Sequence, residues 1–432
     1  MAKWKRNPSD DGKELTSAEY KKAREDKAFD LFADMLIKKI ESAEKTNWQK
    51  PWFAEGQIAW PKALYGKSYH GMNALMLSLL CEEKDYKIPV FATSDRIHSL
   101  NYTKDGNGNR SSVVDDDGNK RPFVHVLKGE HSFPVFVTNV NVVHKETKEK
   151  IKWREYNALS EQEKANYNVY RNRLVHLVFN VDQTNIKESR PELYERLVEE
   201  NVPKKVEYDE SQIFNFEPLD ILIDKQEWIC PINVRELRSG DSPHFSPTKN
   251  EVVLGEKKQY VMGGHPTSWV NDAFHEMIHS TGHKDCLDRL KPTTDKDSYA
   301  REELVAEVSA ALSCHRYGIP NTIQEDSIPY VQSWLSNLRE KPEFIRTVLK
   351  DVKAASSVLD CKIEEIRRLY LNEREEDKLD IREEEESCLE VDDTGDVQLS
   401  SSESLAADKK QGEGEGREPA VKEEQKRGGI HR

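Results

Sequence analysis

The stretch from Thr267 to Gly282, TSWVNDAFHEMIHSTG, determines how the C-terminal half of the chain is interpreted. Its apolar side chains recur every three or four residues, which predicts an amphipathic helix. These apolar positions are Trp269, Val270, Ala273, Phe274, Met277 and Ile278. The hydroxyl of Thr267 or Ser268 can cap the start of this helix, and Gly282 suits a left-handed stop at its end.

Two histidines and a glutamate lie on this predicted helix in the pattern HExxH. His275 and His279 are four residues apart, so both imidazoles project from one face at the separation that two ligands of one Zn²⁺ require. Glu276 lies beside them, where a carboxylate can take a proton from a metal-activated water molecule. We therefore predict a zinc centre with Glu276 as its general base.

A hydrolytic zinc centre also needs a third protein ligand and one open position. A second predicted helix, DSYAREELVAEVSAALSCHRYG, places Glu303 and Glu307 on one face, where one could bind zinc and the other could hold a ligand histidine. Asp285 is an alternative ligand, because HEMIHSTGHKD also fits the spacing HExxHxxGxxD, and His283 is a further one. We favour Glu303, the 24th residue after His279, and leave Glu307 and Asp285 open.

Composition excludes several classes of protein. The chain has 432 residues and a net charge of −14, with 33% charged and 36% hydrophobic residues. No apolar run approaches the ~18 residues that a membrane span needs, and the first residues are too polar for a signal peptide. The six cysteines form no CxxC pair, which argues against a thiolate zinc site and a disulfide scaffold. We expect a cytoplasmic protein with no membrane association.

The alternation of helical and strand-like patterns predicts an α+β fold in two domains. A C-terminal acidic segment without aromatic residues cannot bury enough apolar area to offset its ordering entropy, so we expect disorder there. The predicted parts are a mobile arm (1–27), a first domain (28–190), a linker (191–212), a second domain (213–372) and a disordered acidic tail (373–432).

Individual elements can also be predicted. Helices are expected from Phe29 and over Met72–Leu80, and Ser160 with Glu163 is typical of a helix start inside the charged insert Lys145–Asn168. The predicted strands are Phe123–Leu127, Val135–Val143, Val175–Val181, Leu219–Ile223, Ile229–Val234 and Glu251–Leu254, the last preceded by a short strand and turn from Pro243.

The N-terminal domain interleaves aromatic rings with cations. Residues 1–190 carry 32 basic and 27 acidic side chains, although the whole chain is acidic. Rings that stack on bases and lysines that hold phosphates are typical of proteins that bind single-stranded nucleic acid, although the same rings could fill a core. The candidate DNA-binding residues are Trp48, Lys50, Trp52, Tyr65, Lys67 and Tyr69.

These motifs resemble those of a known family. NWQKPW, the run P-x-x-x-Y-G-K-x-Y-x-G-M-N from Pro61 to Asn73, LKGE and VFNVDQ are similar to the N-terminal domain of ArdC-type antirestriction proteins. FHEMIHSTGH, DRL and YAREELVAEVSAA resemble the metallopeptidase domain joined to it. The two likenesses together extend over residues 28–320, and the metallopeptidase half is the more specific.

The resemblance implies a sequence-independent single-stranded-DNA-binding domain followed by a zincin-like peptidase domain, in a protein that protects mobile-element DNA from host restriction. It implies zinc ligation by His275, His279 and Glu303, with Glu276 as the base. The segments Lys104–Lys120 and Lys145–Asn168 and the acidic tail are additions to the family pattern.

Three hypotheses follow from the sequence. In the first, the N-terminal domain grips single-stranded DNA and the peptidase centre cleaves a protein bound to that strand. In the second, the chain only coats the strand and its zinc is not catalytic. In the third, it is a DNA-gated protease that clears proteins from DNA without any link to restriction.

Overall fold

The structure is a computed structural model that describes residues 16–45, 53, 59–104, 109–115, 117–203, 206–290, 296–321 and 331–371. The chain divides into the units Met1–Asp392 and Asp393–Arg432, and every described residue belongs to the first. The predicted acidic tail lies outside the described residues.

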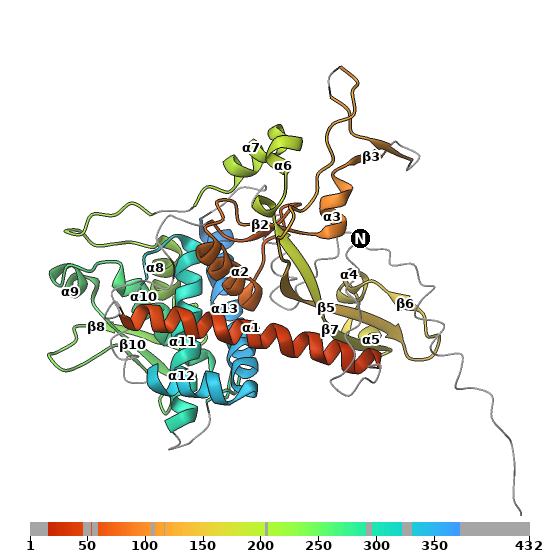
Figure 1. The fold of residues 1–432 in the computed structure, drawn as a ribbon. Coiled ribbons are helices and arrows are strands. Elements are labelled where there is room, and N and C mark those ends of the chain that lie inside the picture. The colour runs from red at the N-terminus through yellow and green to blue at the C-terminus, as the bar shows by residue number, and fades with distance from the viewer. Residues whose placement is uncertain are drawn as a thin grey trace, which may run out of the picture. The chain divides into compact units, whose positions relative to one another are not determined.

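A five-stranded mixed sheet in the order β1-β2-β7-β5-β6 organises the N-terminal part of the chain (Figure 1). Its strands are β1 (Lys62–Ala63), β2 (Val90–Thr93), β5 (Phe133–His144), β6 (Lys150–Ile151) and β7 (Tyr167–Asn180). The long strands β5 and β7 pair antiparallel from Phe133↔Val178 to His144↔Tyr167, and the short helices α4 (Trp153–Asn157) and α5 (Glu161–Lys164) lie in the connection between them. The β-branched and aromatic residues of β5 and β7 favour extended backbone.

Helices surround this sheet. The long helix α1 (Ser17–Lys45) packs Phe29 and Phe32 against Phe133 and Phe136 of β5, with ring centroids 4.8 to 5.7 Å apart. The other elements of this part are α2 (Gly71–Lys84), α3 (Ser94–Ser99), β3 (Tyr102–Lys104), β4 (Arg110–Ser112), α6 (Ile186–Ser189) and α7 (Pro191–Glu200).

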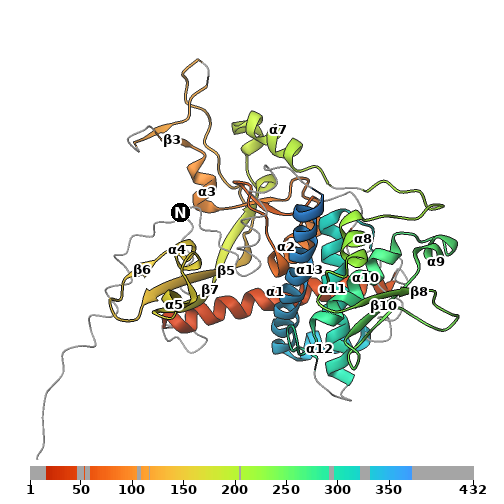
Figure 2. The ribbon, with the colours of Figure 1, turned by 180° about the vertical axis from the view of Figure 1, so that it is seen from behind.

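The C-terminal part joins a small sheet to a group of helices (Figure 2). The sheet has the order β8-β10-β9, with β8 (Ile232–Arg235), β9 (His244–Ser246) and β10 (Glu251–Gly255). The helices are α8 (Glu217–Asp224), α9 (Lys257–Met262), α10 (Ser268–Thr281), α11 (Lys296–Tyr317), α12 (Val331–Glu340) and α13 (Pro342–Tyr370). A continuous cluster of buried side chains extends from α1 and α2 to α10, α11 and α13.

The α+β fold class is confirmed, and so are the principal predicted elements. Helix α2 contains Met72–Leu80, and β5, β7, β8 and β10 contain most of the strand positions expected there. The predicted helix start at Ser160 is present, since Glu163 accepts hydrogen bonds from the Ser160 backbone N–H (2.9 Å) and hydroxyl (2.6 Å). None of the described helices is long and apolar enough to cross a membrane.

The prediction of a strand at Leu219–Ile223 is wrong, because these residues lie in helix α8. The run is too short for periodicity to separate a buried strand from a buried helix. The decisive signals are Pro218 in the first turn and Glu217 near the positive end of the helix dipole.

Other predicted boundaries also need correction. Helix α1 begins at Ser17, inside the segment 1–27 that was expected to be a mobile arm, because Thr16 and Glu19 cap it reciprocally (2.7 and 3.3 Å). Helix α7 occupies the first half of the expected linker 191–212. The expected strand Phe123–Leu127 is reduced to one isolated bridge between Val126 and Thr184.

Candidate metal centre

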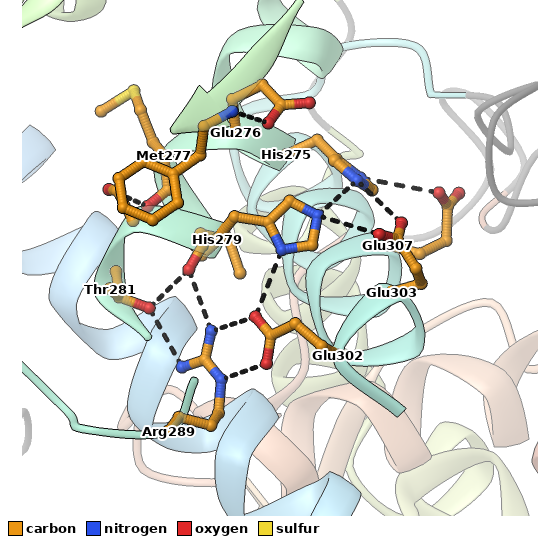
Figure 3. A network of polar contacts seen from close by, with 12 residues as sticks. His275, Glu276, Met277, His279, Thr281, Arg289, Glu302, Glu303 and Glu307 are labelled. Carbon is orange, nitrogen blue, oxygen red and sulfur yellow. Dashed lines mark hydrogen bonds and ion pairs between the residues drawn. The ribbon is translucent and has the colours of Figure 1, made fainter. Parts of the chain in front are cut away.

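Helices α10 and α11 pack against each other and supply the side chains of the predicted metal centre (Figure 3). Helix α10 forms over the predicted residues with its apolar stripe buried, and this burial fixes the direction in which the histidines project. The predicted end signals need correction, because the Thr267 side chain makes no cap hydrogen bond and Gly282 is right-handed, with φ −75°. Helix α11 carries three glutamates, Glu302, Glu303 and Glu307, and all three are buried. Buried carboxylates need a cationic or hydrogen-bonding partner, because desolvating a charge is costly.

Three side chains converge on one point. The Nε2 atoms of His275 and His279 lie 3.0 Å apart. Oε2 of Glu303 lies 3.6 Å from Nε2 of His275, and Oε1 lies 3.6 Å from Nε2 of His279. Ligand atoms placed ~2.0–2.1 Å from a tetrahedral Zn²⁺ would be about 3.3 Å from one another. The observed separations bracket this value, so the donor set fits a small divalent cation.

The electrostatics of the cluster favour a positive charge. Burial alone would lower the pKa of His275 and of His279. Hydrogen bonds outweigh it, so that Glu303 raises the pKa of His275 and Glu302 together with Glu303 raises the pKa of His279 well above its ordinary value. Burial works against ionisation of Glu303, yet its contacts with the two histidines hold the pKa of this carboxyl well below its usual value. The cluster thus stabilises protons on its imidazoles, and a metal cation meets the same requirement.

Glu302 and Arg289 support the centre and were not predicted from the sequence. Glu302 accepts a hydrogen bond from Nδ1 of His279 (3.2 Å), and two guanidinium nitrogens of Arg289 each donate to it at 2.7 Å. Arg289 also donates to the backbone oxygen of Ile278 (3.0 Å) and to the hydroxyl of Thr281 (3.1 Å). The carboxylate therefore holds the His279 ring with Nε2 directed at the cluster.

The structure separates the alternatives for the third ligand. Glu307 lies behind His275, 3.8 Å from Nδ1 on the side of the ring away from the cluster. Asp285 is 67% exposed and faces His283 at 3.2 Å, outside the group of donors that lie within 4.8 Å of one another. His283 packs edge-on against Phe245. Of the candidates, only Glu303 joins the two histidines in that group among the described residues.

Glu276 is held at the side of the cluster by the edge strand β9. The backbone N–H of Phe245 donates to Oε2 of Glu276 at 2.7 Å. The sheet order places β9 at an edge, paired only with β10 among the described strands. This hydrogen bond leaves the second carboxylate oxygen of Glu276 available for a reacting molecule.

The structure divides the candidate DNA-binding residues. Trp48, Lys50 and Trp52 lie outside the described residues. Tyr65 is 62% exposed, with the Arg96 guanidinium 5.3 Å from its ring, and Lys67 is also exposed.

Tyr69 requires a correction. It is only 3% exposed and packs edge-on against Phe91, so its ring belongs to the core and cannot stack on a base. The alternation of rings and cations in the sequence does not distinguish a core ring from an exposed one.

Two family matches cover most of the described chain. Residues 26–179 match the N-terminal domain of anti-restriction factor ArdC, and residues 226–351 match the zincin-like metallopeptidase family. The second match indicates a divalent metal, and the three converging donors of α10 and α11 form a group that could hold one.

Solved structures of similar fold were also found. The metal-free crystal structure of the antirestriction ArdC protein from the R388 plasmid is 21% identical, with a TM-score of 0.51, and covers 78% of this chain and 98% of that one. The Mn(II)-bound structure of the same protein has a TM-score of 0.47 at 21% identity, covering 77% and 97% of the two chains. The first likeness shows a shared fold.

One curated relative is an uncharacterized protein of Bacillus anthracis, 28% identical over 120 residues. The match covers 27% of this chain and 19% of the relative, so the chain spans about a fifth of that protein's length.

Proposed function

Because the chain is an ArdC-type protein, with an ArdC N-terminal domain ahead of a zincin-like domain, we propose that it is an antirestriction protein that binds single-stranded DNA and has a zinc-dependent peptidase centre. The observation that carries the peptidase part is the convergence of His275, His279 and Glu303 beside Glu276. The antirestriction part is supported by the ArdC domain match and by the function named for the R388 protein of the same fold.

His275, His279 and Glu303 would hold the metal ion. Two imidazoles and one carboxylate form a donor set typical of catalytic zinc sites, in which the fourth position stays open. When bound, zinc supplies a Lewis acid that polarises a peptide carbonyl and acidifies a water molecule. The N–H that Nδ1 of His279 presents to Glu302 leaves the Nε2 lone pair free for ligation.

Glu276 would act as the general base. It follows His275 on the same turn of α10, and the N–H of Phe245 fixes one of its oxygens. The other oxygen can take a proton from the attacking water and later pass it to the leaving amine. General acid–base catalysis of this kind typically contributes 10²–10⁴-fold to the rate.

The DNA-binding part is proposed for the N-terminal domain, with Tyr65 and Lys67 among its contacts. Both side chains are exposed, and the ring of Tyr65 lies 5.3 Å from the Arg96 guanidinium. Binding to an incoming single strand in the cytoplasm would bring the peptidase centre close to proteins on that strand. Proximity raises the effective concentration of such a substrate without any new contact.

A cleavage assay tests this proposal. Zinc-loaded wild type and Glu276→Gln are incubated with a general protein substrate, with and without single-stranded DNA, and cleavage is followed on a gel. We expect cleavage by wild type, stimulated by DNA, and at least about 100-fold less by Glu276→Gln. Equal cleavage by the two proteins would contradict the role of Glu276.

Two other functions make different predictions. If the chain only coats the strand, Glu276→Gln keeps full protection against restriction in vivo. If it is a general DNA-gated protease, DNA without a restriction site stimulates cleavage equally well, and restriction in vivo is unaffected. Measuring protection and cleavage with the same variant separates all three.

A further inference from the structure

Strands β5, β6 and β7 carry a row of polar side chains along one face of their sheet. Residues directly opposite each other in an antiparallel pair share a face, and successive residues alternate between faces. The register pairs Asn139 with Asn172, Asn141 with Tyr170, and Val143 with both Asn168 and Lys150. The amide face, as we name it, therefore consists of Asn139, Asn141, Lys150, Asn168, Tyr170 and Asn172.

Two buried asparagines of the same part of the chain make internal contacts that the asparagines of the amide face lack. Buried Asn73 exchanges two hydrogen bonds with the backbone of Phe136 (2.7 and 2.9 Å), and Asn101 does the same with Val124 (3.0 and 2.7 Å). In the part of the chain that the structure describes, no side chain of the four asparagines on the amide face has a hydrogen-bond partner. Asparagine is depleted in strands, so four of them gathered on one face, with their amides unused by the fold, favour a role in binding.

Tyr170 and Lys150 add two other kinds of contact to this face. Tyr170 is 52% exposed, with an open ring surface and hydroxyl. Lys150 is exposed and has no ion-pair partner among the described residues. From Asn139 to Val143 the face extends over about 14 Å at ~3.4 Å per residue.

The opposite face of the same strands carries two arginines that contact neighbouring side chains. The Arg171 guanidinium lies 5.6 Å from the ring of Trp153, and Arg173 is paired with Glu25 of α1 at 3.0 Å. Arg173 also lies over the ring of Phe136. The two arginines of that face thus contact other side chains of the fold, whereas the asparagines of the amide face have no side-chain hydrogen-bond partner among the described residues.

The charge of this region favours a polyanion. Residues 139–173 carry eight basic and five acidic side chains, a net charge of +3 in a chain whose total is −14. Two of the acidic side chains serve as helix caps, since Glu155 and Glu163 accept from backbone N–H groups at 3.1 and 2.9 Å. Lys150 and Arg154 are exposed, without ion pairs in the described residues.

We propose that the amide face binds single-stranded DNA and reads its bases, giving the protein a base preference beyond sequence-independent binding. This inference rests on the proposed function. Tyr170 stacks on a base, the asparagines donate to and accept from base edges, and Lys150 contacts phosphate. An asparagine amide pairs in a bidentate manner with adenine, so adenine is the favoured base.

The test measures binding of the full chain to labelled single strands of 20 deoxyadenosines or 20 thymidines by fluorescence anisotropy. We expect tighter binding of the adenine strand by wild type. N139A/N172A should weaken adenine binding about tenfold and thymine binding less, and Tyr170→Ala should weaken both about tenfold. Lys150→Ala should weaken both equally and lower the slope of log affinity against log salt by about 0.7.

Tyr299→Ala is the matched control, because Tyr299 on α11 is 53% exposed and lies outside the amide face. It should bind both strands within twofold of wild type. Unchanged thermal unfolding shows that each variant is folded. If wild type binds DNA but N139A/N172A and Tyr170→Ala bind like it, the amide face is not a DNA site, while the proposed function stands. If wild type binds neither strand, the amide-face proposal and the DNA-binding part of the proposed function are both contradicted.

Discussion

The metal centre and the amide face use polar side chains in opposite ways. In the metal centre, Glu302 is buried and contacts both Arg289 and His279. On the amide face, Asn139 and Asn172 are exposed and have no side-chain hydrogen-bond partner among the described residues. A small cation requires donors fixed within tenths of an ångström, whereas a flexible polymer can adapt to side chains that are only exposed.

The supporting elements differ in the same way. Helices α10 and α11 belong to the large buried cluster, so a change there disturbs packing as well as ligation. The outer parts of β5 and β7 form a ribbon with exposed residues on both faces. Substitutions should therefore have large and coupled effects on stability and ligation at the metal centre, and small effects on stability at the amide face.

The largest expected effect would come from removing the third ligand. Glu303→Ala should purify with little zinc, because two histidines alone leave the site one protein donor short. Asp285→Ala should keep about one zinc per chain, since Asp285 is exposed and faces only His283. Zinc content by atomic absorption checks both. Zinc retained in Glu303→Ala and lost in Asp285→Ala would reverse the assignment.

A smaller effect is expected from the residues that hold His279. Glu302→Gln keeps the size of the side chain but removes the charge that pairs with Arg289 and holds the His279 ring. Loss of such an outer partner typically costs 10–100-fold in metal affinity. A competition titration with a zinc chelator measures it. Wild-type affinity in Glu302→Gln would show that packing alone orients the ring.

The free energy of unfolding should depend on pH through buried histidines of the core. Burial lowers the pKa of His315 from 6.5 to about 4, and that of His70 to about 3. Below pH 6.5 the unfolded chain binds more protons than the folded one, so stability is lost as the pH falls from 6.5 towards 4. Each histidine contributes at most about 1.4 kcal/mol per pH unit.

His315→Gln should therefore flatten the dependence of the unfolding free energy on pH in that window, measured by urea denaturation. The ring of His315 stacks on Phe53 at 4.5 Å, so some stability is lost at every pH, but the slope reports titration alone. His98→Gln, at an exposed position on α3, is the control. An unchanged slope in His315→Gln would mean that His315 is not held neutral by the fold.

The smallest expected effect is a gain in stability, whereas the substitutions above cause losses. Asn139→Thr combined with Asn172→Thr places a good strand former on each member of an opposed pair. The free energy of unfolding should rise by up to about 1 kcal/mol while DNA binding weakens. Thermal unfolding and anisotropy measure the two quantities. A loss of stability would show that the asparagines support the fold itself.

The sequence predicted the residues of the metal centre better than its surroundings. Spacing on one helix was enough for His275 and His279, because i and i+4 side chains share a face. Spacing could not tell which of Glu302 and Glu303 faces the two histidines, because α11 is buried on nearly all sides and has no exposed polar face from which the orientation of the helix could be deduced. Arg289 comes from the loop after α10, and helical periodicity carries no signal for it.

The wrong predictions came from sequence patterns that are short or that mix apolar and charged residues. The apolar run Leu219–Ile223 suits either a strand or a buried helix. In the structure it lies in helix α8, which packs against α13. Tyr69 lies in a run of rings and cations, yet its burial depends on β2 being adjacent, through Phe91. Contacts between residues far apart in the sequence cannot be deduced from local spacing.

The central claim is that two histidines of α10 and one glutamate of α11 bind a single zinc ion. The most direct measurement is anomalous diffraction at the zinc edge from crystals of the zinc-loaded protein. We expect one peak, ~2.0–2.2 Å from Nε2 of His275, Nε2 of His279 and an oxygen of Glu303. A peak coordinated by Asp285 or His283 in place of Glu303, or no peak between the histidines, would contradict it.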